Sequence, residues 1–385
     1  MTLGERLEAV RGRPAGFDYM RLVLSTMVLA WHSVVTSYGP AMQDSAASGL
    51  ARAPAALTMP LFFCLSGFAV TGSLERSRTL VGFMGLRILR IYPALLVAVL
   101  AATFVVGPLL TTYPLGAYFS DPVTWRYFAG VTGVVAYELP GVFLDNPNPV
   151  RVNGQLWTVP FDMFCYSLFA ALAALGLVKR RRAFLVAALV IWAAAAAWFL
   201  ARHGLSPDRR FQNVPGSFLI VFFLAGAAVY LYRDRLPWSG WLAAVAASAS
   251  LALFCVPVWG DLFAAPGVAY LMAYLGLLNP RKHAVLKVAD LSYGVFIYGY
   301  LIQQCLMTLG PWTHRWWVNL LLTFPIVWTV ALLSWRYVEK PALRQRTLLF
   351  ALEERWIGRR RRFVDAAARL GRLRPPARVG ASAER

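Results

Sequence analysis

Residues 183–200 read AFLVAALVIWAAAAAWFL, a run of 18 apolar residues that follows Arg182 directly. A helix needs about 20 apolar residues to cross a hydrocarbon core of about 30 Å, and uncharged runs of about 18 or more are candidates for such a helix. In water a helix of this composition would have no polar face to expose. The run therefore predicts a helix that crosses a membrane.

Comparable runs recur along most of the chain. Of its 385 residues, 59% are hydrophobic and 15% charged, whereas soluble domains are roughly half apolar and about 25% charged. We expect about ten spans, so the predicted fold class is an all-α, polytopic transmembrane helix bundle. Their approximate limits are 19–38, 53–73, 86–110, 156–178, 183–200, 216–232, 241–258, 262–278, 288–309 and 316–335. The join at 256–261 is short, which leaves open that the seventh and eighth spans form one broken unit.

The positions of Lys and Arg predict the orientation of the bundle, because positively charged loops stay in the cytoplasm. With both termini cytoplasmic, only about seven of the 38 basic residues face outward. An even number of spans fits this asymmetry best. The first span is expected to be retained as an anchor, since no short apolar run ends in a small-residue cleavage site.

Two segments lie outside the expected spans. The longest outward connection, 111–155, is rich in Pro, Gly and Tyr, and a loop of that length usually has a functional reason. We expect one transmembrane domain over 1–344 and a basic cytoplasmic tail over 345–385. The tail alternates apolar residues with Arg around 356–363, which predicts an amphipathic helix on anionic lipid, followed by a disordered end.

The net charge of +20 does not indicate nucleic acid binding, because the basic residues lie between apolar segments and in the tail. All four cysteines sit in apolar stretches, where a thiol behaves as a small hydrophobe. We therefore expect neither a disulfide framework nor a metal site. No internal repeat is evident, which weighs against a transporter, since many transporters have two related halves.

His32 is the one histidine of the four that lies inside an apolar run. Ionisable residues within spans are costly and are therefore functional candidates. Arg21 precedes His32 by eleven residues, about three helical turns, so both side chains share a face with Arg21 about 16 Å nearer the cytoplasm. Such a face offers an anion binder and a deeper base. A snorkelling arginine and a histidine hydrogen-bonded within the bundle explain the pair equally well.

Arg87 and Arg90 share a helix face at the cytoplasmic start of the third span. Together with Arg21 they could hold phosphates, for which guanidinium geometry is well suited. Ordinary positive-inside anchoring is the simpler explanation. The pair Ser66-Gly67 lies in an aromatic helix and leaves room for another helix or for a thin ligand chain.

The fourth span begins with NGQLWTVPFD at 153–162 and carries Asp162 about two turns inward. A carboxylate at that depth needs a partner. The sequence leaves open whether Asp162 takes part in chemistry or makes a satisfied polar contact at the external end of the helix.

Six motifs in this order resemble the acyltransferase-3 family of membrane proteins, which includes bacterial O-acetyl and O-succinyl transferases of polysaccharides, glycans and some antibiotics. The resemblance covers about 17–344. It rests on Arg21 and His32 with ten residues between them, FFCLSGF at 62–68, RILRIYP at 87–93, LPGVF at 139–143 with NGQLWTVP at 153–160, DLSYG at 290–294 and SWRYVEKP at 334–341. The fourth motif resembles the branch often linked to exopolysaccharide modification.

The resemblance implies an O-acyltransferase in the inner (plasma) membrane that takes an acyl group, expected to be acetyl, from cytoplasmic acyl-CoA. The acceptor would be a hydroxyl of a carbohydrate or small molecule, and no permanently bound cofactor is expected. His32 and Asp162 would be catalytic. The other expected site residues are Arg21, Arg87, Arg90, Ser66 and Tyr92 for acyl-CoA, and Asn153 and Trp157 for the acceptor.

Two positions depart from the family. Asp162 stands where Glu is more common, and Gly299 stands where many members have His, so no catalytic role is assigned to Gly299. His32 would act as a general base, because a neutral imidazole is available near pH 7, and an acyl-histidine intermediate stays open. The alternatives are a transporter or flippase of a glycolipid, and a regulator that binds acyl-CoA or a sugar lipid without turnover.

Overall fold

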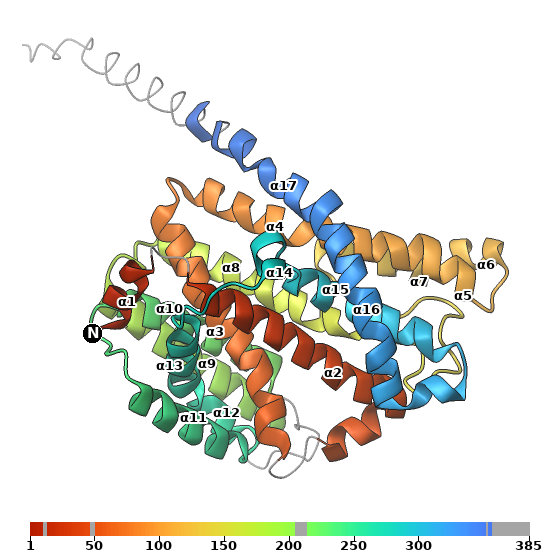
Figure 1. Cartoon of the computed structure of the whole chain (residues 1–385), viewed down its shortest axis with the longest axis horizontal. Helices are drawn as coiled ribbons and strands as arrows, with labels where there is room; N and C mark the ends of the chain where they lie inside the picture. Colours follow the sequence, from red (N-terminus) through yellow and green to blue (C-terminus); the bar gives the residue numbers. More distant parts are fainter. Residues whose placement is uncertain (11–13, 47–50, 205–213, 352, 356–385) are drawn as a thin grey trace, which may run out of the picture.

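A computed structural model of the chain describes residues 1–10, 14–46, 51–204, 214–351 and 353–355. Its named elements in these ranges are helices, which confirms the all-α fold class (Figure 1). The α-helices are α1 (Leu3–Ala9), α2 (Ala15–Ala46), α3 (Arg52–Arg76), α4 (Leu80–Ala101), α5 (Gly107–Leu110), α6 (Leu115–Ser120), α7 (Pro122–Phe128), α8 (Val159–Ala174), α9 (Arg181–His203), α10 (Gly216–Leu231), α11 (Gly240–Phe254), α12 (Trp259–Phe263), α13 (Ala265–Gly276), α14 (Ala284–Val288), α15 (Ser292–Met307), α16 (Trp316–Ser334) and α17 (Lys340–Arg344).

Six helices within the described ranges are long and apolar enough to cross a membrane. Their limits are Ala15–Gly39, Arg52–Arg76, Leu80–Leu110, Gly154–Ala174, Arg181–His203 and Trp316–Arg355. The other four predicted spans correspond to α10, α11, α13 and α15, which have 16, 15, 12 and 16 residues. The chain is a helical membrane protein, while the count of ten spans and the cytoplasmic position of both termini stay predictions.

Glycines allow α3 and α10 to pack closely. A Cβ atom on Gly67 would lie 1.9 Å from the carbonyl oxygen of Phe223, and one on Gly226 would lie 1.9 Å from that of Cys64. Small residues at such crossings are typical of membrane bundles, where close backbone packing drives helix association. Gly67 of the predicted Ser66-Gly67 pair therefore serves helix packing.

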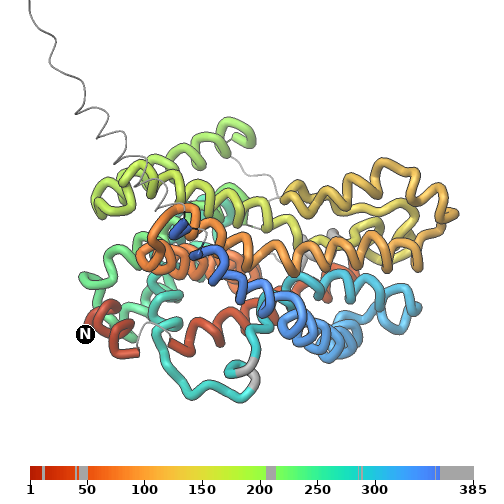
Figure 2. The backbone as a smooth tube through the Cα atoms, turned by 90° about the horizontal axis from the view of Figure 1, so that it is seen from above, coloured from red at the N-terminus to blue at the C-terminus, as the bar shows by residue number. Residues whose placement is uncertain are grey.

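The buried apolar side chains form two clusters, one around α3, α10 and α13 and the other around α4, α15 and α16. Helix α2 belongs to both, because Leu24 packs in the first cluster and Leu29 in the second. Figure 1 shows α10 and α13 toward the left, and Figure 2 shows the blue tube of α16 to the right of the centre. Helix α2 thus connects the two parts of the bundle, which explains why its side chains reach the cavities described below.

A buried ion pair fixes the short join between α11 and α13. Arg52 donates from Nη1 and Nη2 to the two carboxylate oxygens of Asp261 at 3.0 and 2.7 Å, and the two side chains are 1% and 0% exposed. Asp261 also accepts from the backbone N–H of Val258, whose φ of 66° lies in the left-handed region. The seventh and eighth predicted spans are therefore separate helices joined by a tight turn and the short α12.

The predicted outward loop contains α6 and α7 and then folds back onto α15. The side-chain amide of Gln304 donates to the carbonyl oxygens of Asn148 and Arg151 at 2.8 and 2.6 Å. Asn148 in turn donates to the hydroxyl of Tyr300 at 2.6 Å. The end of this loop is thereby held against the helix that packs beside His32.

Candidate active site

Two neighbouring cavities lie between the helices. One, the His32 cavity, has a volume of about 700 Å³, and the other, the arginine cavity, has a volume of about 480 Å³. Met59, Thr158 and Phe296 line both, so the cavities share a wall. Most of the His32 cavity is apolar or aromatic, whereas the arginine cavity is lined by Arg21, Arg76, Arg87, Arg90 and Arg346.

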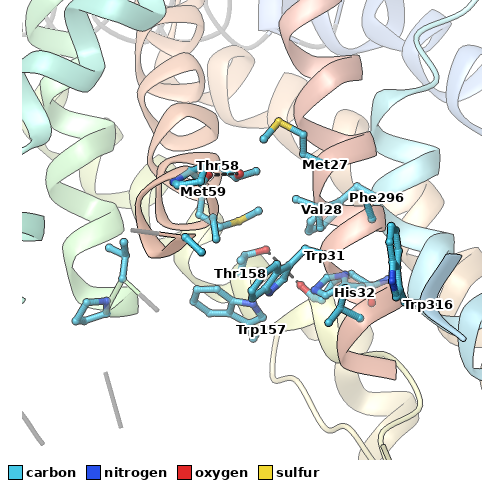
Figure 3. A pocket seen from close by; sticks show the side chains of 18 residues that line it. Met27, Val28, Trp31, His32, Thr58, Met59, Trp157, Thr158, Phe296 and Trp316 are labelled. Atoms are coloured by element: carbon cyan, nitrogen blue, oxygen red, sulfur yellow. Dashed lines mark hydrogen bonds between the residues drawn. The ribbon is translucent and has the colours of Figure 1, made fainter. Parts of the chain in front are cut away.

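Helix α2 contributes one predicted residue to each cavity. Arg21 lines the arginine cavity and His32 the His32 cavity. The helix between them is continuous, because its kink lies further along at Gly39, where φ is 77°. Figure 3 shows His32 pointing into a space that it shares with Trp157 and Trp316. The spacing of eleven residues thus places two kinds of side chain along one face at different depths.

Packing against aromatic rings holds the His32 imidazole. The rings of His32 and Tyr300 meet edge-on, with centroids 5.2 Å apart and an interplanar angle of 81°. Among the described residues, none hydrogen-bonds to the imidazole. The ring nitrogens are therefore available to a molecule in the cavity, and the histidine satisfied within the bundle, which the sequence left open, is not what the structure contains.

A buried glutamine fixes the turn of α2 that carries His32. Gln303 on α15 is 0% exposed, and its amide donates to the carbonyl oxygen of Leu29 at 2.8 Å and to the hydroxyl of Ser33 at 2.7 Å. Ser33 directly follows His32, and Leu29 lies three residues before it. Because these bonds are made in a protein interior, their loss would leave unpaired polar groups. Gln303 therefore sets the position of the His32 backbone.

Arg90 is already neutralised by the protein. Its Nη2 donates to Asp290 at 2.6 Å, and its Nη1 lies 3.6 Å from Glu339 Oε2. Glu339 follows α16 and Asp290 precedes α15, so Arg90 ties α4 to both helices. An arginine with two carboxylate partners has little charge left for a ligand.

Arg87 and Arg21 are less neutralised than Arg90. Arg87 donates to the hydroxyl of Ser73 at 3.0 Å and forms no ion pair with any described residue. Arg21 lies 3.5 Å from Asp18, which also binds Lys282. Of the three arginines predicted from the sequence, Arg87 therefore has the most positive charge available for an anion.

Sequence reasoning missed two arginines of the cavity, Arg76 and Arg346. Neither forms an ion pair within the part of the chain that the structure describes. A helical spacing in α3 could have identified Arg76, because side chains three and four residues apart share a face. The α3 residues on this face that line the cavity include Phe62, Ser66, Ala69, Ser73 and Arg76. Nothing in the sequence placed Arg346 near them.

Ser66 and Asp162 line the arginine cavity. The hydroxyls of Ser66 and Tyr166 are 3.1 Å apart. Asp162 lies four residues after Thr158, so it is about one helical turn, or about 6 Å along the helix, from the shared wall. In the described ranges no side chain forms a hydrogen bond or ion pair with the Asp162 carboxylate. Asp162 is thus on the arginine side of the wall, and His32 is on the other.

The remaining predicted site residues differ in position. Trp157 lines the His32 cavity, whereas Tyr92 and Asn153 line neither cavity. The Tyr92 hydroxyl contacts the sulfur of Met163 at 3.8 Å. Asn153 is buried and donates to the carbonyl oxygen of Ile297 at 3.5 Å, while Gln155, which does line the His32 cavity, donates to the same oxygen at 2.8 Å. These two bonds join the short 3-10 helix that precedes α8 to α15.

Comparison with known proteins identifies the family. A family model described as an acyltransferase domain matches residues 15–337. The chain belongs to the acyltransferase-3 family. It is 30% identical over 379 residues to nodulation protein 10 of Rhizobium leguminosarum bv. viciae, covering 91% of this chain and 98% of that protein. It is 25% identical over 354 residues to an O-acetyl transferase of Shigella phage Sf6, covering 88% and 98%. No solved structure matches.

Family membership confirms the resemblance and makes this protein an acyltransferase. The structure shows the packing at Gly299, the position where the resemblance leads us to expect His. A Cβ atom on Gly299 would lie 2.6 Å from Cδ1 of Leu29, which is three residues before His32. A side chain there would have to displace Leu29, so in this acyltransferase the position serves the contact between α15 and α2.

Proposed function

We propose that this acyltransferase moves an acyl group, expected to be acetyl, from acyl-CoA to a hydroxyl of a carbohydrate or glycoconjugate at the bacterial inner membrane. One observation carries the proposal: a cavity rich in arginine shares a wall with a cavity that holds a histidine whose ring has no hydrogen-bond partner among the described residues. The first suits the phosphates of a CoA thioester, since guanidinium groups bind phosphate well. The second cavity suits an acceptor hydroxyl, whose proton the histidine would take.

The donor would lie with its phosphates at Arg87 and Arg21 and its pantetheine along the Ser66 side of the arginine cavity. This extended arrangement brings the thioester to the shared wall of Met59 and Thr158. We assign Arg90 to support of this cavity, because its charge is balanced by two carboxylates.

The acceptor would enter the His32 cavity. Trp31, Trp157 and Trp316 line it together with a few polar groups such as Gln155, and binding sites of this kind combine apolar surface with a small number of oriented polar contacts. The name of the phage relative, O-acetyl transferase, supports a hydroxyl as the acceptor and acetyl as the group transferred.

His32 would take the proton of the acceptor hydroxyl as its oxygen attacks the thioester carbonyl carbon. A carbon–oxygen bond then forms and the carbon–sulfur bond breaks. The leaving thiolate of CoA receives the proton from the imidazolium, so charge and atoms balance. Asp162 is proposed to bind polar groups near the wall, since its carboxylate lines the donor side about one turn from Thr158.

The test uses purified protein in lipid nanodiscs with acetyl-CoA and candidate glycan acceptors. We expect thioester consumption with acetylated acceptor as product, and a loss of at least about a hundredfold in His32→Gln, because glutamine cannot accept the proton at neutral pH. Normal folding of His32→Gln is the control. A glycolipid transporter would consume no acetyl-CoA, and a regulator would bind it without turnover. Near-normal transfer by His32→Gln would remove His32 from the mechanism.

A further inference from the structure

Part of the lining of the arginine cavity comes from residues beyond the range that the family model matches. The family model matches the chain up to residue 337, whereas Leu343 and Arg346 also line the cavity. Both belong to a C-terminal helix, defined here as residues 340–355, which begins with α17 and continues as helix through the described residues 346–351 and 353–355. Figure 1 shows its blue ribbon continuing from α16 and α17.

The C-terminal helix packs closely against α4. A Cβ atom on Gly82 would lie 2.8 Å from Oε1 of Glu353, and one on Gly85 would lie 2.6 Å from Cδ2 of Leu349. The hydroxyl of Thr79 donates to the same Glu353 carboxylate, whose residue is 5% exposed. Gly82 and Gly85 are three residues apart and therefore lie on one face of α4. This face leaves room for the C-terminal helix.

This packing determines where Arg346 points. Arg346 precedes Leu349 by three residues and Glu353 by seven, so the three side chains lie on the same face of the helix. Two of them contact α4, and Arg346 lines the cavity beside Arg76 and Arg87. Arg346 forms no ion pair with a described residue. Asp162 and Asp290 also line the cavity, but Asp290 is paired with Arg90, and Asp162 forms no ion pair with a described residue. Guanidinium groups repel one another, so Arg76, Arg87 and Arg346, which have no ion-pair partner among the described residues, suit an anion that neutralises them.

We propose that the C-terminal helix completes the donor site and that Arg346 binds a phosphate of the acyl donor together with Arg76 and Arg87. The proposal rests on the proposed function, because it assumes that acyl-CoA occupies the arginine cavity. Guanidinium groups bind phosphate in a bidentate manner. A lipid headgroup offers the same phosphate chemistry, so the experiment must separate the two sources.

The test compares Arg346→Ala with Arg344→Ala, an exposed arginine two residues earlier that does not line the cavity. Both variants are assayed in nanodiscs of neutral phosphatidylcholine, with acetyl-CoA and with acetyl-pantetheine, which has the thioester but no phosphate. Arg346→Ala should lower kcat/KM for acetyl-CoA about tenfold, the lower end for a lost charged hydrogen bond, and should leave acetyl-pantetheine unaffected. Arg344→Ala should match wild type with both donors.

Binding of adenosine 3′,5′-bisphosphate gives a readout that needs no turnover, and Arg346→Ala should weaken it by a similar factor. Equal losses with both donors, or no difference from Arg344→Ala, would overturn the proposal. A defect confined to nanodiscs containing anionic phosphatidylglycerol would overturn it too, and would assign Arg346 to lipid. If wild type consumes no acetyl-CoA, the proposed function fails; if only the Arg346 comparison fails, the proposed function stands.

Discussion

Replacing Arg90 with alanine should destabilise the fold more than it weakens donor binding. The change leaves Asp290 and Glu339 without their cation, and these side chains are 32% and 2% exposed. Among the described residues, the Glu339 carboxylate would then keep a hydrogen bond only from the hydroxyl of Ser334, at 3.1 Å. Breaking a buried ion pair costs about 3 to 5 kcal/mol, because a charge is left uncompensated. The ion pair between Arg90 and Asp290 is about a third exposed, so its loss contributes less to the destabilisation. We therefore expect the free energy of unfolding to fall by about 3 kcal/mol.

The assay is denaturant unfolding of purified protein in parallel with binding of acetyl-CoA. Arg87→Ala is the matched control, since Arg87 lies one turn away and has no ion pair among the described residues; it should unfold like wild type and bind the donor about tenfold or more weakly. Glu339→Gln in the Arg90→Ala background should recover part of the lost stability by removing the unpaired charge. If Arg90→Ala unfolds like wild type and loses donor binding, the structural role is wrong and Arg90 belongs to the donor site.

Four further predictions concern the bundle and its orientation. Gly67→Val should prevent folding, because its Cβ would lie 1.9 Å from a carbonyl oxygen of α10, whereas Ser66→Ala should give a normal yield of monodisperse protein in size-exclusion chromatography. Arg52→Ala should lower the unfolding free energy by about 3 to 5 kcal/mol, as its carboxylate partner is fully buried; an unchanged denaturation curve would contradict this. Gln303→Leu should lower kcat with little change in KM for acetyl-CoA, and equal changes in both would argue against a positioning role. A cysteine at Ser382 should resist impermeant reagents in intact cells, and labelling from outside would refute cytoplasmic termini.

The long helices could be predicted from the sequence because apolar runs report directly on burial in lipid. The predicted span 183–200 corresponds to α9, Arg181–His203. The third span was predicted to begin at 86, yet α4 begins at Leu80. The early turns of α4 contain glycines that face the C-terminal helix, and this contact depends on residues more than 260 positions away. Hydropathy describes how a segment meets lipid and contains no information about such contacts.

The candidate site was predictable only where its geometry lies within one helix. Arg21 and His32 share a face of α2, so helical period alone placed them along one line. The pairing of Arg90 with Asp290 could not be derived in this way, because 200 residues separate the two. Sequence reasoning therefore treated Arg87 and Arg90 as equivalent. In the structure, Arg90 is paired with Asp290 across the bundle and stabilises the fold. Arg87 has no ion-pair partner among the described residues, so its charge is available to a ligand.

The wall formed by Met59, Thr158 and Phe296 has a consequence for which acyl groups this enzyme accepts. If donor and acceptor occupy the two cavities, only the acyl end of the thioester needs to pass between these three side chains. A short chain such as acetyl needs little room there, while a longer chain must displace the flexible Met59 or the ring of Phe296. Chain-length selectivity would then reside at this wall and not in the arginines or His32. The transferred group could then change by substitution of Met59 or Phe296, with donor recognition and the proton acceptor left intact.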